Sequence, residues 1–61
     1  MDEWTEIKDN FVDELQVPGV YRFTSGQWVE TIEVEDTDDQ CAVDRFLQIE
    51  HEHPKVERLN Q

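Results

Sequence analysis

The chain has 61 residues, of which 16 are Asp or Glu and 5 are Lys or Arg, so its formal net charge at pH 7 is −11. A chain of this length forms at most one domain, and folding buries only about 60% of the surface of so short a chain. The charge argues against direct binding to nucleic acid or to an anionic membrane, because both depend on clustered Lys and Arg. We therefore expect one small acidic domain over residues 1–61.

Other features of the composition limit the cellular and chemical context. The single cysteine, Cys41, excludes an internal disulfide and a zinc site built on cysteine pairs. The first ten residues, MDEWTEIKDN, carry acids where a signal peptide needs basic and apolar residues, and no segment approaches the roughly 20 apolar residues of a membrane span. These features predict a cytoplasmic protein. Its aromatic residues supply core anchors that disordered acidic chains lack, so we expect it to fold.

The first predicted element is a helix over residues 2–15. Its apolar residues recur at the spacing of one helix face, at Trp4, Ile7, Phe11, Val12 and Leu15. Pro18 disfavours a helical conformation of the residue before it, so the helix should end near Gln16.

The next segment predicts a β-hairpin. Val20–Thr24 alternates Tyr21 and Phe23 on one side with polar or smaller residues on the other. Residues 28–35 continue the alternation, with Trp28, Ile32 and Val34 on one face. Ser25 and Gly26 between the two strands favour a tight turn.

The segment after the hairpin is compatible with a helix or a third strand. Thr37 and Gln40 have the spacing of a capping box, which predicts a helix from Asp38 to about Glu50. Its buried face would be Ala42, Val43, Phe46 and Ile49. The alternative strand rests on the alternation of Cys41, Val43, Leu47 and Ile49, and the cap signal favours the helix. Residues 55–61, after Pro54, are expected to be a frayed tail from which Val56 and Leu59 could dock on the core. The predicted fold is α+β in the order α-β-β-α.

The acidic residues become informative when they are placed on these elements. On the first helix Asp2, Glu6, Asp9 and Asp13 would share the face opposite the apolar stripe. They would be spaced about 4.5 to 6 Å apart along the axis, a separation of the same order as that between nucleic-acid phosphates. A solvated helix usually mixes Lys with Glu, whereas this segment has only Lys8. The excess of one sign therefore indicates a partner.

The expected function is a protein-binding module that mimics nucleic-acid phosphates and competitively inhibits a basic nucleic-acid-binding protein. In its overall profile the chain is similar to the small acidic inhibitors that phages and mobile elements make against host nucleic-acid machinery. We expect a monomer or a weak homodimer. The candidate partner-binding residues are Glu6, Asp9, Asp13, Glu33, Glu35, Asp36, Asp38 and Asp39.

The sequence is also compatible with two different roles. A two-stranded hairpin cannot stand alone, so the chain could be a small assembly protein that associates with itself through its sheet edge. Proteins of salt-rich cytoplasm also carry many acids and few lysines, so the charge could be an adaptation to the solvent.

The sequence does not indicate an enzyme, a metal site or a cofactor. His51 and His53 with Cys41 could supply three zinc ligands, but they lack the i,i+4 histidine spacing of helical zinc enzymes and a second cysteine pair. We expect both histidines to be exposed near a helix end. Cys41 is expected to be a small buried residue whose thiolate is disfavoured by nearby acids.

Overall fold

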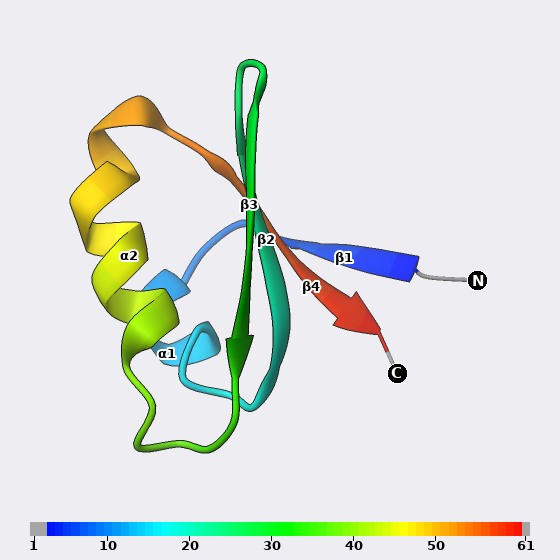
Figure 1. Cartoon of the computed structure of the whole chain (residues 1–61), viewed down its shortest axis with the longest axis vertical. Helices are drawn as coiled ribbons and strands as arrows, with labels where there is room; N and C mark the ends of the chain where they lie inside the picture. The colour runs from blue at the N-terminus through cyan, green and yellow to red at the C-terminus, as the bar shows by residue number, and fades with distance from the viewer. Residues whose placement is uncertain (1–2, 61) are drawn as a thin grey trace.

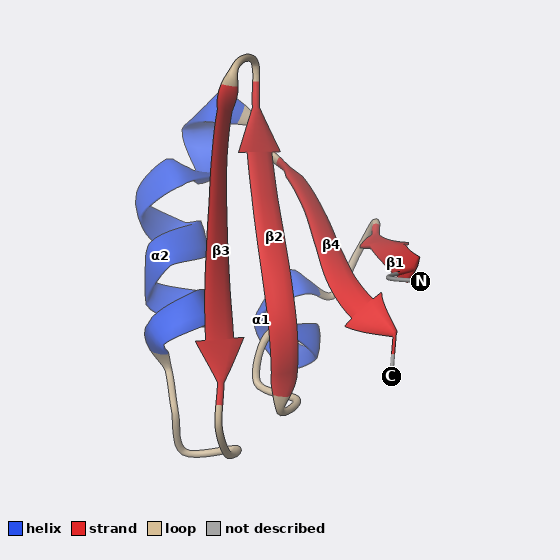
Figure 2. Cartoon of the chain, turned by 45° about the vertical axis from the view of Figure 1, so that its right-hand side comes forward, coloured by secondary structure: helices blue, strands red, loops and turns tan. Residues whose placement is uncertain are grey.

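The computed structural model describes residues 3–60, which form a mixed α+β domain. Four strands make one antiparallel sheet in the order β1-β4-β2-β3, and both helices lie on the same face of it (Figures 1 and 2). In chain order the elements are β1 (Glu3–Ile7), α1 (Phe11–Glu14), β2 (Gly19–Ser25), β3 (Trp28–Val34), α2 (Cys41–Ile49), the 3-10 turn η1 (Glu50–Glu52) and β4 (Lys55–Asn60).

The strand order is built from two interlocked units. Strand β4 is antiparallel to both β1 and β2, so β1 and β2 run parallel on either side of it. Likewise β3 and β4 run parallel with β2 between them. Each parallel pair is joined through one of the helices, which makes two split β-α-β units. The C-terminal strand therefore holds the two halves of the chain together.

The predicted first helix is wrong, because the domain begins with a strand. Within the predicted range, residues 3–7 form β1 and only residues 11–14 are helical. Asn10 separates the two with a φ of 53°, a left-handed conformation that Asn adopts more readily than most residues. Ile7 and Leu15 are buried as expected, but Val12 is 44% exposed. The apolar residues whose spacing predicted one helix therefore belong to a strand and to one short helical turn.

The predicted hairpin is confirmed. Strands β2 and β3 pair over their full length, and Tyr21 and Phe23 are fully buried on the helix side of the sheet. Gly26 adopts a φ of 61° at the first position of the two-residue loop, a position where such loops require a left-handed backbone.

The helix predicted after the hairpin is also confirmed, in preference to a third strand, although it begins at Cys41 and not at Asp38. The expected capping box does not form, since Gln40 is the N-cap residue and makes no side-chain capping bond. The four predicted core residues of this helix, Ala42, Val43, Phe46 and Ile49, are all buried. Phe46 also stacks on Phe11 of α1 with ring centroids 4.7 Å apart, which joins the two helices.

The expectation of a frayed C-terminal tail is wrong for its described part. Residues 55–60 form β4, which lies inside the sheet and pairs with both β1 and β2. Val56 is 1% exposed and Glu57 is 8% exposed. Besides its two apolar residues, β4 consists of Lys55, the oppositely charged neighbours Glu57 and Arg58, and Asn60, so the segment has little apolar character. It can lie inside the sheet because the Glu57 carboxylate is paired with Arg22 of β2. Residue 61 lies outside the described residues.

The core lies between the sheet and the helices. Its largest fully buried side chains are those of Tyr21, Phe23, Leu15, Val34 and Val56. No helix in residues 3–60 has the length and apolar character needed to cross a membrane.

Candidate acidic interface

Most of the few basic side chains form ion pairs, and they do so with only three glutamates. Four of the five Lys and Arg side chains form ion pairs with these glutamates. The pairs are Arg22–Glu57 at 2.9 Å, Lys55–Glu57 at 3.8 Å, Arg45–Glu30 at 3.0 Å and Arg58–Glu14 at 3.2 Å. Within residues 3–60 none of the eight candidate carboxylates takes part in an ion pair. The uncompensated negative charge of the chain therefore includes all eight candidate positions.

The structure does not bring the eight carboxylates into one row. The predicted row along a helix face does not exist, because Glu6 lies in β1, Asp9 in the following loop and Asp13 in α1. The fourth member of that row, Asp2, lies outside the described residues. Glu33 is exposed on β3, at the opposite edge of the sheet from Glu6. The remaining four candidates lie together in the connection between β3 and α2, which Figure 1 shows at one end of the sheet.

This connection, Glu35–Asp39, has a defined shape. The Asp36 carboxylate accepts a hydrogen bond from the backbone N–H of Asp38 at 2.9 Å. The Asp39 carboxylate accepts bonds from the N–H of Cys41 at 3.0 Å and of Glu35 at 3.3 Å, so it joins the end of β3 to the start of α2. Among the described residues, the carboxylates of Glu35 and Asp38 accept no hydrogen bond. We call residues 35–39 the acidic loop, in which Asp36 and Asp39 hold the backbone and Glu35 and Asp38 face solvent.

The environment of Asp39 and Cys41 shifts the pKa of both groups. Hydrogen bonds from Cys41 and from the backbone N–H of Glu35 lower the pKa of Asp39. Hydrogen bonding with Asp39, partial burial and the charge of that carboxylate raise the pKa of Cys41. The expected disfavoured thiolate is therefore supported, but the expected burial of Cys41 is wrong, because the residue is exposed at the first position of α2.

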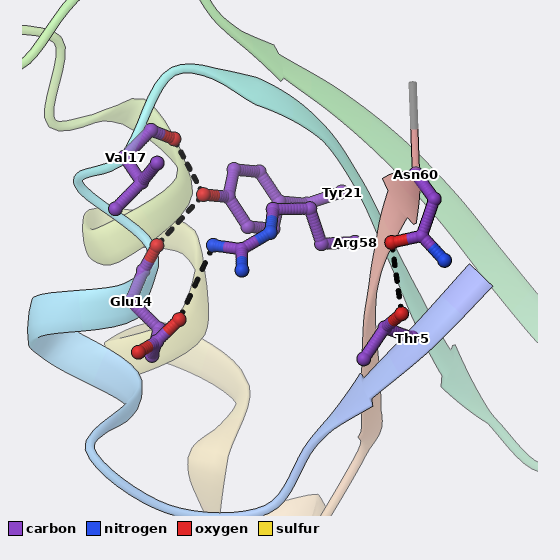
Figure 3. A network of polar contacts seen from close by, with 6 residues as sticks. All are labelled: Thr5, Glu14, Val17, Tyr21, Arg58 and Asn60. Atoms are coloured by element: carbon purple, nitrogen blue, oxygen red, sulfur yellow. Dashed lines mark hydrogen bonds and ion pairs between the residues drawn. The ribbon is translucent and has the colours of Figure 1, made fainter.

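A second acidic region borders a pocket of about 400 Å³ between β1 and α1. The pocket is lined by Thr5, Glu6, Ile7, Lys8, Asp9, Glu14 and Arg58. Figure 3 shows the polar network behind it, in which Arg58 donates to the Glu14 carboxylate at 3.2 Å. The fully buried Tyr21 hydroxyl lies within hydrogen-bond distance of the backbone carbonyl oxygens of Glu14, at 2.7 Å, and Val17. These contacts hold α1 and the loop after it on the sheet. Glu6 and Asp9 line the same pocket.

The two histidines lie where the sequence predicts, exposed at the end of the second helix. The Nε2 atom of His51 is 3.7 Å from a Glu52 carboxylate oxygen. In the part of the chain that the structure describes, no three His, Cys, Asp or Glu side chains are grouped so that they could hold a metal ion.

Comparison of the chain with models of protein families, with curated proteins and with solved structures gave no match. The four acids of the acidic loop were predicted as candidate contacts, although Asp38 and Asp39 were expected in the second helix. The use of the cations was not predicted, because each long-range ion pair joins residues that are far apart in the chain. The spacing of charged residues along the sequence contained no signal for these pairs.

Proposed function

We propose that the protein presents carboxylates in place of nucleic-acid phosphates and competes for the basic site of a nucleic-acid-binding protein. The observation that supports this proposal is the separation of two sets of acids. Three glutamates take up four of the five cations, while the eight candidate carboxylates make no ion pair within residues 3–60. Acids left without a cation in the folded chain are available to the cations of a partner.

The acidic loop is the main contact in this proposal. Glu35 and Asp38 present free carboxylates on a backbone that Asp36 and Asp39 hold in place, so little ordering is needed on binding. Because the charge of the partner is of the opposite sign, long-range attraction would speed association and would weaken with added salt. Phosphate-like contacts of this kind compete directly with DNA or RNA for the same basic side chains.

The experiment is affinity capture from a host lysate, with and without added DNA, followed by measurement on the purified partner. The test variant is Glu35→Gln/Asp38→Asn, which removes the two free carboxylates of the acidic loop. The matched control is Glu3→Gln/Glu50→Gln, which neutralises two exposed acids outside the candidate set. Each variant moves the formal net charge from −11 to −9.

We expect a basic nucleic-acid-binding protein that DNA displaces, that the loop variant fails to retain, and that the control variant retains. Recovery of no basic protein would refute the mimic. Equal loss of binding in both variants would show that total charge, and not the acidic loop, attracts the partner.

A further inference from the structure

Strand β3 has one backbone edge that pairs with no other strand of residues 3–60. In the sheet order β1-β4-β2-β3 it pairs with β2 on one side only, and Figure 2 shows it at one side of the sheet. The outer edge of such a strand presents backbone N–H and C=O groups to which another extended segment can bond. With seven residues, β3 is longer than β1, the five-residue strand at the other edge.

The hairpin geometry identifies the backbone groups of β3 that point away from β2. Ser25 and Trp28 are paired on either side of the two-residue loop, and the end residues of such a turn are joined by a backbone hydrogen bond. Residues that bond the neighbouring strand alternate with residues that do not. Counted from Trp28, the residues whose backbone groups point outward are therefore Val29, Thr31 and Glu33.

Contacts at the end of β3 agree with this assignment. The Glu33 carbonyl oxygen accepts a hydrogen bond from the Cys41 thiol at 3.5 Å, and the Glu35 N–H donates to the Asp39 carboxylate at 3.3 Å. Cys41 and Asp39 lie outside the sheet, so these backbone groups point away from β2. Within the described residues the outward N–H and C=O groups of Val29 and Thr31 have no such partner. We call these four groups the free edge.

The free edge lies on a strand that is already held in place. Arg45 of α2 bonds the Glu30 carboxylate at 3.0 Å, and its guanidinium carbon lies 5.3 Å from the centroid of the Trp28 ring. The contacts of Cys41 and Asp39 hold the other end of the strand. A segment that pairs with β3 therefore meets a preorganised edge, which lowers the cost of binding.

The charges around the free edge favour a basic segment. Residues 28–39, which include β3 and the acidic loop, contain six carboxylates and no Lys or Arg. Glu33 makes no ion pair within residues 3–60, and Arg45 is already neutralised by Glu30, so it would not repel a cation. A second copy of the chain, with a net charge of −11, would instead be repelled. The other edge is less suited to a basic segment, because Lys8 directly follows β1.

We propose that an extended segment of a protein partner, rich in Lys or Arg, adds to the edge of β3 as a fifth strand. Its backbone bonds the free edge, and its cations lie beside Glu33 and the acidic loop, which directly follows β3 in Figure 2. The inference rests on the proposed function, since it describes how the basic partner is held. The carboxylates attract the segment, and the main-chain hydrogen bonds align it and add affinity that does not depend on charge.

The first test uses a defined probe, a short peptide in which Lys and Val alternate. The control peptide has the same sequence with an N-methyl group on each central residue, which keeps the charge and removes the N–H donors of both edges. NMR at low salt would follow chemical shifts and amide hydrogen exchange. We expect the first peptide to slow exchange at Val29 and Thr31 but not at Glu30 and Ile32, which already bond β2, and the control to bind at least about tenfold more weakly.

The second test changes the free edge itself. Thr31→Pro removes the outward N–H and leaves the bonds to β2 intact, which is why Pro is tolerated in edge strands. Thr31→Val is the matched control, because it keeps both the N–H and the branched shape, and neither change alters the net charge. We expect Thr31→Pro to weaken binding of the first peptide at least about tenfold and Thr31→Val to leave it unchanged. Circular dichroism would confirm that both variants fold, and the methylated peptide tests the wild type if Thr31→Pro does not.

Several outcomes would overturn the inference. Equal binding of the two peptides, unchanged binding to folded Thr31→Pro, or shifts confined to the acidic loop would show that charge alone attracts the peptide. Protection of β1, or self-association through β3 without peptide, would assign a different edge or a different occupant. The mimic is tested separately with the captured partner. If that partner binds Thr31→Pro as tightly as wild type but not the Glu35→Gln/Asp38→Asn variant, the edge inference fails and the mimic stands. If peptide binds the edge and no basic partner is captured, the mimic fails.

Discussion

The place of β4 inside the sheet can be tested with one pair of valines. Val56 is 1% exposed in β4, whereas Val12 is 44% exposed in α1. Truncating a buried Val to Ala removes two methylene equivalents at about 0.8 kcal/mol each and leaves a small cavity, so Val56→Ala should cost about 2 kcal/mol. The same change at Val12 should cost less than about 0.5 kcal/mol, because surface changes seldom cost more.

The loss at Val56 would be a large part of the stability of so small a domain. At about 0.05 to 0.15 kcal/mol per residue a chain of this length has about 3 to 9 kcal/mol in total. With an unfolding entropy of about 2.1 cal/mol/K per residue, Val56→Ala should lower the Tm by roughly 15 °C. Urea titration and thermal melting followed by circular dichroism would measure both variants against the wild type.

The reversed result would refute the fold. If residues 2–15 were one amphipathic helix and residues 55–61 a frayed tail, Val12→Ala would be the costly substitution and Val56→Ala would be nearly neutral. Equal and small losses at both positions would also contradict the structure, because they would leave β4 without a buried contact.

Four further results are expected. Gly26→Ala should destabilise the hairpin by about 1 to 2 kcal/mol, since a side chain is disfavoured at a φ of 61°; unchanged urea unfolding would contradict that backbone geometry. Because the pKa of Asp39 is lowered in the folded chain, its contribution to stability is present above the pKa of the unfolded chain and is lost as the pH falls through the lower folded value. NMR titration of the Asp39 carboxyl should therefore show a midpoint below the ordinary value. Asp39→Asn should remove this part of the acid sensitivity. The raised pKa of the Cys41 thiol should slow its alkylation by iodoacetamide at about pH 8 relative to a small thiol, and Asp39→Asn should speed that reaction; a rate equal to that of the free thiol would contradict the contact. A chelator should leave the circular dichroism signal unchanged, and loss of structure in EDTA would show that a metal supports the fold.

Sequence patterns predicted those parts of the fold in which the apolar residues of a segment follow a single period, that of a strand or that of a helix. The alternation in residues 20–24 and 28–35 and the helical spacing of Ala42, Val43, Phe46 and Ile49 predicted a hairpin and a helix that the structure confirms. The first segment failed because Trp4 and Ile7 belong to one element and Phe11 and Leu15 lie at another, yet the four positions together match a helical period. The Asp-Asn pair at residues 9 and 10 was the available signal for a break, since both residues favour turns.

The C-terminal strand could not be predicted from its own residues. Lys55–Asn60 contains two apolar side chains, and its central place depends on β1 and β2 on either side and on the Arg22–Glu57 pair. These are long-range contacts that composition and periodicity do not encode. The four acids of the acidic loop stay together in the structure because they are close in sequence, although two of them were expected in the second helix, whereas the predicted row that includes Glu6, Asp9 and Asp13 depended on the first helix and was lost with it.

The use of the cations also bears on why so acidic a chain can fold. The side chains of Arg22, Arg45 and Arg58 are each about one-third exposed, and each bonds a glutamate from another element of the fold. Attraction at these partly buried contacts is screened less by water and salt than repulsion between exposed acids. The favourable charge interactions thus lie where they join strands and helices, and the unfavourable ones lie in loops and at sheet edges. Glu35 and Asp38 belong to the second group and accept no hydrogen bond within the described residues, so removing their charge should relieve repulsion without loosening the sheet, whereas Asp36 and Asp39 also hold the backbone of the acidic loop. Glu35 and Asp38 are therefore the positions at which an effect on a partner can be measured separately from an effect on the fold.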